Sequence, residues 1–169
     1  NGMTIIDPSK NKFLRFNRIE DEEYGADLNL AGKINTIYQT GEVVWLATRE
    51  GIAKAKQEQN EYKFSVYRHD LNPENEFLLN ATAFLSHNYN DELWVGTETN
   101  GLFRINGKTM KQVAHYILDE NDAKSFSSFG VKTLHQSNDG TVWIGTAGEG
   151  LYRYNNNEDN FDRWSVHNG

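Results

Sequence analysis

A tryptophan recurs at a fixed interval along this chain. Trp45, Trp94 and Trp143 lie 49 residues apart, and each begins a similar phrase: "WLATREGIAK", "WVGTETNGLFRI" and "WIGTAGEGLYRY". A threonine follows each tryptophan at the same spacing, and then a glycine, one residue earlier in the first copy; these repeat positions are Thr48, Thr97, Thr146, Gly51, Gly101 and Gly150. A period of this size predicts a chain built from copies of one supersecondary unit.

Each unit contains four short runs with strand character. The runs "INTIYQ", "ATAFLS" and "VKTLHQ" precede the tryptophans, and the aromatic runs "YKFSVY", "QVAHY" and "FDRWSV" end the units. Apolar and polar residues alternate with the period of two expected of a strand, as in "LYRYN" from Leu151. Asn138–Gly140 and Gln39–Glu42 supply residues that suit tight turns. Because no amphipathic helix is evident, the sequence predicts an all-β protein.

Four antiparallel strands in each unit of about 50 residues are typical of β-propeller blades. A small sheet with two apolar faces cannot cover itself, so it must stack between neighbours. We expect the repeated tryptophans to fill the spaces between successive blades. A β-sandwich is a minor alternative, since it also needs many short strands.

The chain starts within a unit, because "NGMTIID" at Asn1 mirrors "NGLFRIN" at Asn100. We therefore expect about three and a half four-stranded blades in one propeller segment, with both ends exposing strand edges and apolar faces. This predicts that the chain is part of a longer propeller. The expected outer half of a blade covers 1–19, the blades cover 32–68, 80–117 and 130–167, and the polar linkers cover 20–31, 69–79 and 118–129.

The composition excludes several classes of function. The chain carries 24 acidic against 17 basic residues and a formal charge of -7, which argues against nucleic acids and anionic membranes as partners. No apolar run is long enough to span a bilayer, and no signal peptide is visible. The absence of cysteine excludes disulfides and thiolate metal sites, and it fits either a reducing cytosol or an oxidising periplasm.

The last unit, "SFSSFGVKTLHQSNDGTVWIGTAGEGLYRYN", resembles the two-component regulator propeller repeat. The match is carried by Val131, Asp139, Gly140, Trp143, Gly145, Thr146, Gly150 and Leu151. The middle unit matches at Trp94, Gly96, Thr97, Gly101 and Leu102 but lacks the Asp-Gly turn. The first unit departs most, with Ala47 for the first glycine and Ile52 for the leucine.

This resemblance implies a seven-bladed propeller in the periplasmic part of a membrane-anchored sensor histidine kinase, frequently of the hybrid kind. It also implies a homodimer formed through that sensor and a signal passed across the membrane. Related arrays precede diguanylate cyclase modules, so the output module is left open. No kinase or receiver segment lies within the 169 residues. We accordingly predict a sensory segment with no catalysis of its own.

Motifs for other chemistry are weak in this sequence. "GTETNG" and "GTAGEG" are followed by no helix and no Lys-Ser/Thr pair, so a nucleotide loop is disfavoured. The acidic segments at Asp119 and Ile19 do not have the spacing of a calcium loop, and no two histidines have metal-ligand spacing. We predict no catalytic residue, no metal and no cofactor.

The remaining candidates are polar residues on loops between second and third strands, which gather on one face of a propeller. Loops on a rigid scaffold are common ligand sites. We expect a small molecule or an oligosaccharide to bind there, at Arg49, Glu50, Glu98, Asn100 and Glu149. The alternative function is a secreted lyase or a carbohydrate-binding or carbohydrate-processing propeller, which needs a convergent group of His, Arg and carboxylate.

Overall fold

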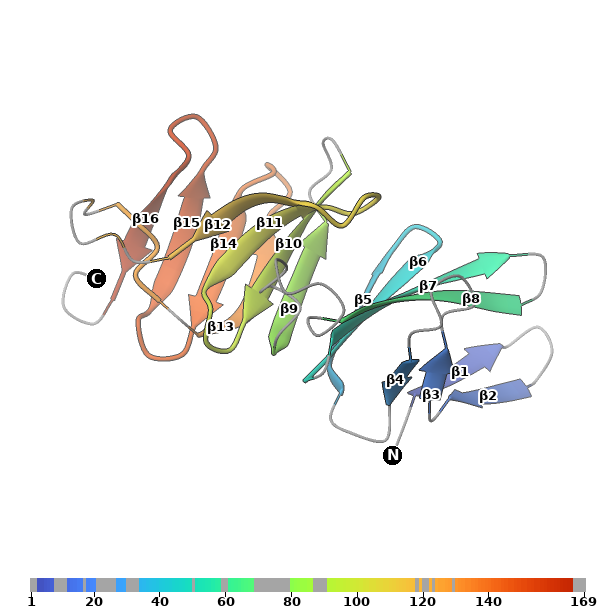
Figure 1. The fold of residues 1–169 in the computed structure, drawn as a ribbon. Helices are drawn as coiled ribbons and strands as arrows, with labels where there is room; N and C mark the ends of the chain where they lie inside the picture. The colour runs from blue at the N-terminus through green and yellow to red at the C-terminus, as the bar shows by residue number, and fades with distance from the viewer. Residues whose placement is uncertain are drawn as a thin grey trace.

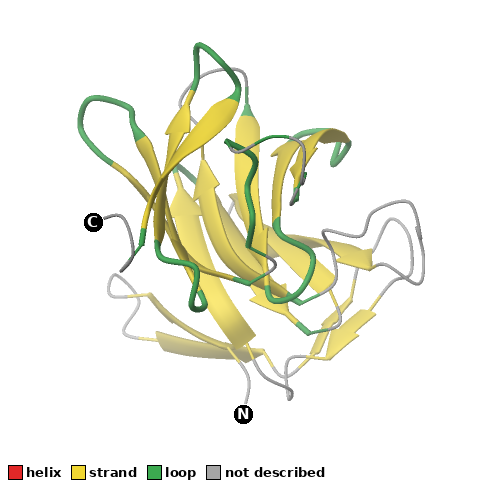
Figure 2. Cartoon of the chain, turned by 90° about the vertical axis from the view of Figure 1, so that its left-hand side faces the viewer, coloured by secondary structure: helices red, strands yellow, loops and turns green. Residues whose placement is uncertain are grey.

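The structure is a computed structural model, and the part of it that can be described is all β. It describes residues 3–7, 12–16, 18–20, 27–29, 34–49, 51–58, 61–68, 80–86, 91–117, 119, 122, 124–128 and 130–165. Within these ranges the regular elements are strands, joined by turns and loops, with no helix (Figure 2). The described residues therefore contain no helix that could cross a membrane.

Three antiparallel four-stranded sheets form most of the structure, and each follows chain order from its first to its fourth strand. Figure 1 shows the sheets one after another along the chain. The first sheet contains β5 (Ile34–Thr40), β6 (Val43–Thr48), β7 (Gly51–Glu58) and β8 (Glu61–Arg68). The second contains β9 (Ala81–Ser86), β10 (Glu92–Thr97), β11 (Leu102–Asn106) and β12 (Gln112–Tyr116). The third contains β13 (Val131–Gln136), β14 (Val142–Thr146), β15 (Leu151–Asn155) and β16 (Asn160–Trp164).

Apolar cores fill the spaces between successive sheets, as the repeat predicted. Trp45 is 3% exposed and shares a cluster with Phe84, Phe103 and Ile105 of the second sheet. Trp94 is fully buried and meets the Tyr154 ring of the third sheet edge-on, with 4.8 Å between ring centroids. The prediction that these two indoles separate successive sheets is confirmed.

Trp143, the third member of the series, is only partly buried. Its ring lies 5.8 Å from that of Trp164 in its own sheet, and its Nε1 donates to Ser137 Oγ. The apolar residues Val142 and Ile144 on either side of it along β14 point the other way, into the core shared with the second sheet. The face that carries Trp143 has no sheet against it among the described residues.

The first strands of successive sheets are direct neighbours. β9 contacts both β5 and β13, and Gly96 on β10 allows β13 to approach closely. A Cβ atom at Gly96 would lie 2.8 Å from Val131 Cβ, well inside contact distance. Gly96 therefore serves the packing of the two sheets.

The N-terminal part forms two further hairpin-like pairs. β1 (Met3–Asp7) pairs with β2 (Lys12–Phe16), and Met3 is buried in a cluster with Leu46, Ala53 and Val66 of the first sheet. β3 (Arg18–Glu20) pairs with β4 (Asp27–Asn29). The range 20–31 was expected to be a plain linker, and the structure differs by placing β4 inside it. The charged sequence between β3 and β4 has no alternation of apolar and polar residues, so it did not predict these two strands.

The serial stacking of the sheets is that of propeller blades and not of the two packed layers of a β-sandwich.

Candidate functional site

The loops between second and third strands are closed by the repeated threonine and glycine. Thr97 Oγ1 donates to Gly101 O at 2.9 Å and accepts from Asn100 N at 2.9 Å. Thr146 Oγ1 donates to Gly150 O at 2.7 Å. In the first sheet, Thr48 Oγ1 makes the same bond to the carbonyl of its glycine at 3.0 Å. One hydroxyl therefore fixes the geometry of each loop.

Two of the glycines need their freedom of conformation. Gly101 and Gly150 have φ angles of 77° and 92°, values that side chains disfavour. A Cβ at Gly101 would also lie 2.5 Å from Tyr116 O. Gly51 has no positive φ, which agrees with its shorter loop. The glycine-rich phrase is therefore turn architecture.

These loops meet the segments that lead into the first strands. Glu98 N donates to Asn80 O at 3.0 Å, and Ala147 N donates to Gly130 O at 2.9 Å. A Cβ at Gly130 would lie 3.2 Å from Glu98 O and 3.1 Å from Ala147 Cβ, so loops of two sheets converge on this glycine. We call the surface formed by residues 49, 98–100, 130 and 147–149 the loop face.

The predicted ligand residues have different surroundings on this face. Arg49 and Glu98 are exposed, whereas Asn100 is partly buried and its carbonyl lies 2.8 Å from His115 Nε2. Glu149 forms a short ion pair with Arg163 and also accepts from Arg163 Nε through its carbonyl at 2.9 Å. Glu50 lies outside the described residues. Ligand binding by these residues stays a prediction.

Arg163 contacts the loop face through Glu149 and was not among the ligand residues predicted from the sequence. It reaches Ser127 Oγ at 3.4 Å, and its guanidinium lies 5.7 Å from the Tyr152 ring centroid. Ser127 Oγ in turn lies 2.5 Å from the Tyr152 hydroxyl. Alternation along β16 places Arg163 on the same face as buried Phe161, and the register Tyr152–Arg163 brings it beside the loop.

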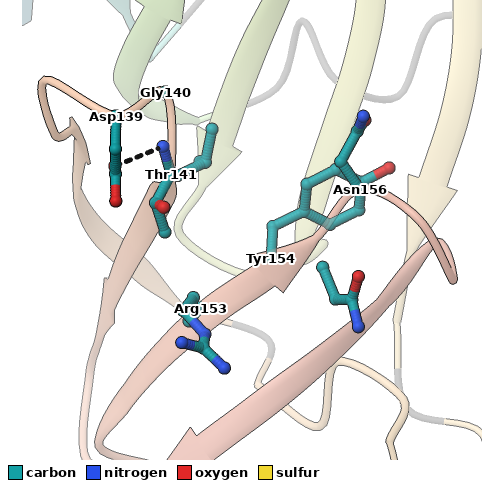
Figure 3. Close-up of a pocket in the computed structure, with 8 residues that line it drawn as sticks. Asp139, Gly140, Thr141, Arg153, Tyr154 and Asn156 are labelled. Carbon is teal, nitrogen blue, oxygen red and sulfur yellow. Dashed lines mark hydrogen bonds between the residues drawn. The ribbon is translucent and has the colours of Figure 1, made fainter.

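A cleft of about 400 Å³ lies at the opposite end of the third sheet, where β14 begins and β15 ends. Figure 3 shows Asp139 and Thr141 on one side of it and Tyr154 and Asn156 on the other. Asp139 Oδ1 accepts from Thr141 N at 3.0 Å, and this backbone bond, followed by bonds from the Thr141 and Ser137 hydroxyls, lowers the pKa of Asp139. Its carboxylate thus holds the Asn-Asp-Gly turn that the sequence predicted.

A polar cluster joins the second and third sheets. Arg104 Nη1 donates to the Tyr154 hydroxyl at 2.8 Å, and Arg104 Nε lies 3.1 Å from Glu92 Oε2. The hydroxyls of Tyr116 and Tyr154 both donate to Asp159 Oδ1, at 2.7 and 2.6 Å. Asp159 therefore links a tyrosine from each sheet.

The charge of Asp159 is favoured by these contacts. Partial burial raises the pKa of Asp159, but hydrogen bonds from Tyr116 and Tyr154 and the positive charge of Arg104 outweigh burial, so the net direction is down. Burial, followed by the hydrogen bond to Asp159, raises the pKa of Tyr116 far above its ordinary value. Both tyrosines therefore remain hydroxyl donors at neutral pH.

An Asp159→Asn variant is expected to be less stable than the parent chain at pH 7, and the difference is expected to shrink in acid. A carboxyl with a lowered folded-state pKa adds stability above its unfolded pKa and loses it as the pH falls through the folded value. The parent chain is therefore expected to lose this stabilisation below about pH 4. Urea unfolding at neutral and acidic pH measures the difference in the free energy of unfolding between the variant and the parent chain. In a Tyr116→Phe background the acid-dependent part is expected to be smaller, and an unchanged pH profile in Asp159→Asn would contradict this assignment.

The described residues contain no group of three His, Asp or Glu side chains that could hold a metal ion. His115 is stacked on Phe103, with 3.9 Å between ring centroids. On the loop face, therefore, the polar chemistry available is that of exposed carboxylates, guanidinium groups and backbone amides.

The fold and the loop face are those of a β-propeller segment. Over 80% of its length the chain superposes on the β-propeller domain of Cps50 (Swd1) from Myceliophthora thermophila, with a TM-score of 0.52, 11% identity and 46% of that chain covered. No family model and no curated protein matches the sequence.

Solved structures from Bacteroides are more similar. The chain resembles the extracellular domain of the candidate hybrid two-component system BT3049 from B. thetaiotaomicron, with a TM-score of 0.64, 18% identity, and 80% of this chain and 19% of that chain covered. It also resembles the extracellular domain of BT4673, another candidate hybrid two-component system from the same organism. The TM-score is 0.63 and the identity 18%, and the superposition covers 99% of this chain and 20% of that chain. The chain thus spans about a fifth of the length of these solved extracellular domains. Their class is the one that the sequence resemblance implied.

Proposed function

We propose that this chain is part of an extracytoplasmic sensory propeller of a two-component regulator, and that its loop face binds a small-molecule or oligosaccharide ligand without catalysis. The observation that carries the proposal is the superposition of nearly the whole chain on the extracellular domain of BT4673. The repeat phrases "LWVGTETNGL" and "VWIGTAGEGL" support it independently, because they resemble the repeat of that class of sensors.

The construction of the loop face supports a binding role. Each loop is fixed by a threonine hydroxyl, and the loops of two sheets converge on Gly130. A rigid scaffold that carries exposed charged groups, here Arg49 and Glu98, presents them to a ligand at little entropic cost. Ligand binding would favour one of two packing states in a membrane-anchored dimer and so pass the signal across the membrane.

Charge reversal on the loop face is expected to alter ligand binding without changing the stability of the free protein. Arg49→Glu and Glu98→Lys change exposed side chains, so the melting temperature without ligand stays the same. Thermal shift with a panel of neutral and acidic oligosaccharides provides the measurement. Lys111→Glu, an exposed residue in the turn between β11 and β12 at the other end of the sheet, is the matched control.

Two results would count against the proposal. Silence of the whole panel would exclude oligosaccharide sensing, and an equal loss in Lys111→Glu would show that net charge alone matters. Depolymerisation of any acidic polysaccharide in the panel would instead favour the lyase alternative. The reading frame that encodes the chain separates the two functions, since a membrane-spanning helix followed by a kinase core belongs only to the sensor.

A further inference from the structure

A cleft of about 250 Å³ lies between the first and second sheets, at the end of the strands opposite the loop face. Both sheets that form it have all four strands among the described residues. Trp45 and Lys54 line the cleft from the first sheet, and Asp91, Glu92 and Lys108 line it from the second. Because most of these side chains are charged, the cleft suits a polar ligand.

Lys54 is the cation in the interior of this cleft. Its Nζ lies 5.3 Å from the centroid of the Trp45 ring and donates to Gly107 O at 3.2 Å. An ammonium group has three donors, so the bond to one carbonyl leaves two for another acceptor. Partial burial lowers the pKa of Lys54, and the positive charge of Lys56 lowers it further. An anion beside Lys54 would offset both effects.

The carboxylates that line the cleft are engaged by other cations. Asp91 Oδ2 lies 2.5 Å from Lys108 Nζ at the exposed rim. Glu92 Oε2 lies 3.1 Å from Arg104 Nε, which belongs to the polar cluster of the second and third sheets. Among the described residues, Lys54 is therefore the charged residue of this cleft that has no ion pair.

The interface between the second and third sheets shows what accompanies this cation elsewhere in the repeat. Lys54 and Arg104 hold the same position, each opposite the tryptophan of its sheet in the strand register. Arg104 Nη1 donates to the Tyr154 hydroxyl at 2.8 Å and lies 3.9 Å from Asp159 Oδ1. Arg104 is thus met by a hydroxyl and a carboxylate from the following sheet.

The second sheet offers Lys54 neither of these groups. Met110 stands one repeat interval of 49 residues before Asp159, and Ile105 stands at the same interval before Tyr154. Met110 and Asp159 have φ angles of 53° and 52°, so the chain turns in the same way at both positions. Met110 and Ile105 are buried in the core with Trp45. The first interface therefore keeps the cation of the polar cluster and lacks the carboxylate.

We propose that this cleft binds a small molecule through a carboxylate, which accepts hydrogen bonds from Lys54 Nζ as Asp159 accompanies Arg104 at the next interface. A volume of about 250 Å³ suits a ligand smaller than those of ordinary binding pockets. Lys108 balances the charge of Asp91 at the rim, so repulsion of an incoming anion is reduced. The site is separate from the loop face, and the proposal goes beyond the sensory function and does not rest on it.

Titration of the isotope-labelled chain with D-glucuronate and with D-glucose, followed by NMR, tests the proposal. The two sugars differ by a carboxylate in place of a hydroxymethyl group. In titrations to about 10 mM, glucuronate is expected to shift the indole resonance of Trp45 and the amide resonance of Gly107. Glucose is expected to leave both resonances unchanged.

Variants of two lysines on one strand identify the group that binds. Lys54→Met removes the ammonium and keeps an unbranched side chain over Trp45, and it is expected to weaken glucuronate binding at least about tenfold. Lys54→Arg keeps the charge and is expected to keep the binding. Lys56→Met is the matched control, because it removes the same charge from an exposed position of β7 outside the cleft. Its affinity is expected to stay within about twofold of the parent chain.

Met110→Asp gives Lys54 a carboxylate from the second sheet, in a backbone conformation that aspartate tolerates. This variant is expected to lose glucuronate binding, and its melting temperature shows whether it is folded; where it is not, the two lysine variants decide. Three results overturn the proposal: no shift with glucuronate, equal binding of glucose, or Lys54→Met that binds glucuronate as the parent chain does. An equal loss in Lys56→Met overturns it as well, because net charge alone would then attract the anion.

Discussion

Replacing Trp94 with alanine is expected to lower the free energy of unfolding by about 3–5 kcal/mol. Trp94 is fully buried between the second and third sheets, edge-on to Tyr154 and stacked against Tyr116 at 5.6 Å between ring centroids. The large cavity left by the indole would have to be filled by the movement of two whole sheets, which their hydrogen-bonded strands resist. Urea unfolding followed by circular dichroism measures the change.

Trp143→Ala is the matched control, since it removes the same side chain from the same place in the repeat. The substitution removes the contact with Trp164 and the bond to Ser137, and among the described residues no sheet covers the outward face of Trp143. We expect a loss of no more than about 1–2 kcal/mol. Equal losses in the two variants would show that the indole stabilises its own sheet and not the space between sheets.

The fold could be predicted from the sequence because its determinants are periodic. The interval of 49 residues between tryptophans requires the same structure at each copy, and alternation assigns each side chain to a face. The hydrogen bonds of Thr97 and Thr146 were also predictable, because a threonine followed by glycine suits a local turn bond. Determinants of the fold that repeat along the sequence can therefore be recognised without the structure.

The contacts that do not repeat could not be predicted in this way. Arg163 reaches the loop face only through the register of β15 with β16, and Asp159 bonds tyrosines from two sheets. The sequence indicates neither a register nor the distance between two sheets. β4 was missed for a related reason, since a three-residue strand in a charged segment carries no pattern.

The same distinction applies to the predicted ligand residues of the loop face. The sequence placed Arg49, Glu98, Asn100 and Glu149 on loops of one kind, but the structure leaves Arg49 and Glu98 exposed, partly buries Asn100 and pairs Glu149 with Arg163. Glu149 is engaged by Arg163, whereas Glu98 remains exposed. A ligand that contacts this face therefore meets one charged group that is already paired and others that are available.

Gly96→Ala is expected to destabilise the chain by about 1–3 kcal/mol, although it adds a single methyl group. The added Cβ would lie 2.8 Å from Val131 Cβ, and closer still to one of its methyl groups. Both residues are buried, so β10 and β13 would have to separate. Gly145→Ala is the control at the equivalent position, where the Cβ would meet the methyl group of exposed Thr133 at 2.7 Å. A rotatable exposed side chain can move away, so the loss there is expected to be smaller.

A double-mutant cycle with Val131→Ala identifies the cause. Val131→Ala alone leaves a small cavity and is expected to lower the free energy of unfolding by about 2 kcal/mol. In the double variant the new methyl group at residue 96 occupies part of that cavity. The combined loss is therefore expected to be at least about 1 kcal/mol smaller than the sum of the single losses. Additive losses would mean that Gly96 is required for the conformation of its own strand and not for the approach of the neighbouring sheet, and the first strands would then be held together by hydrogen bonds such as that from Thr82 to Val131 O.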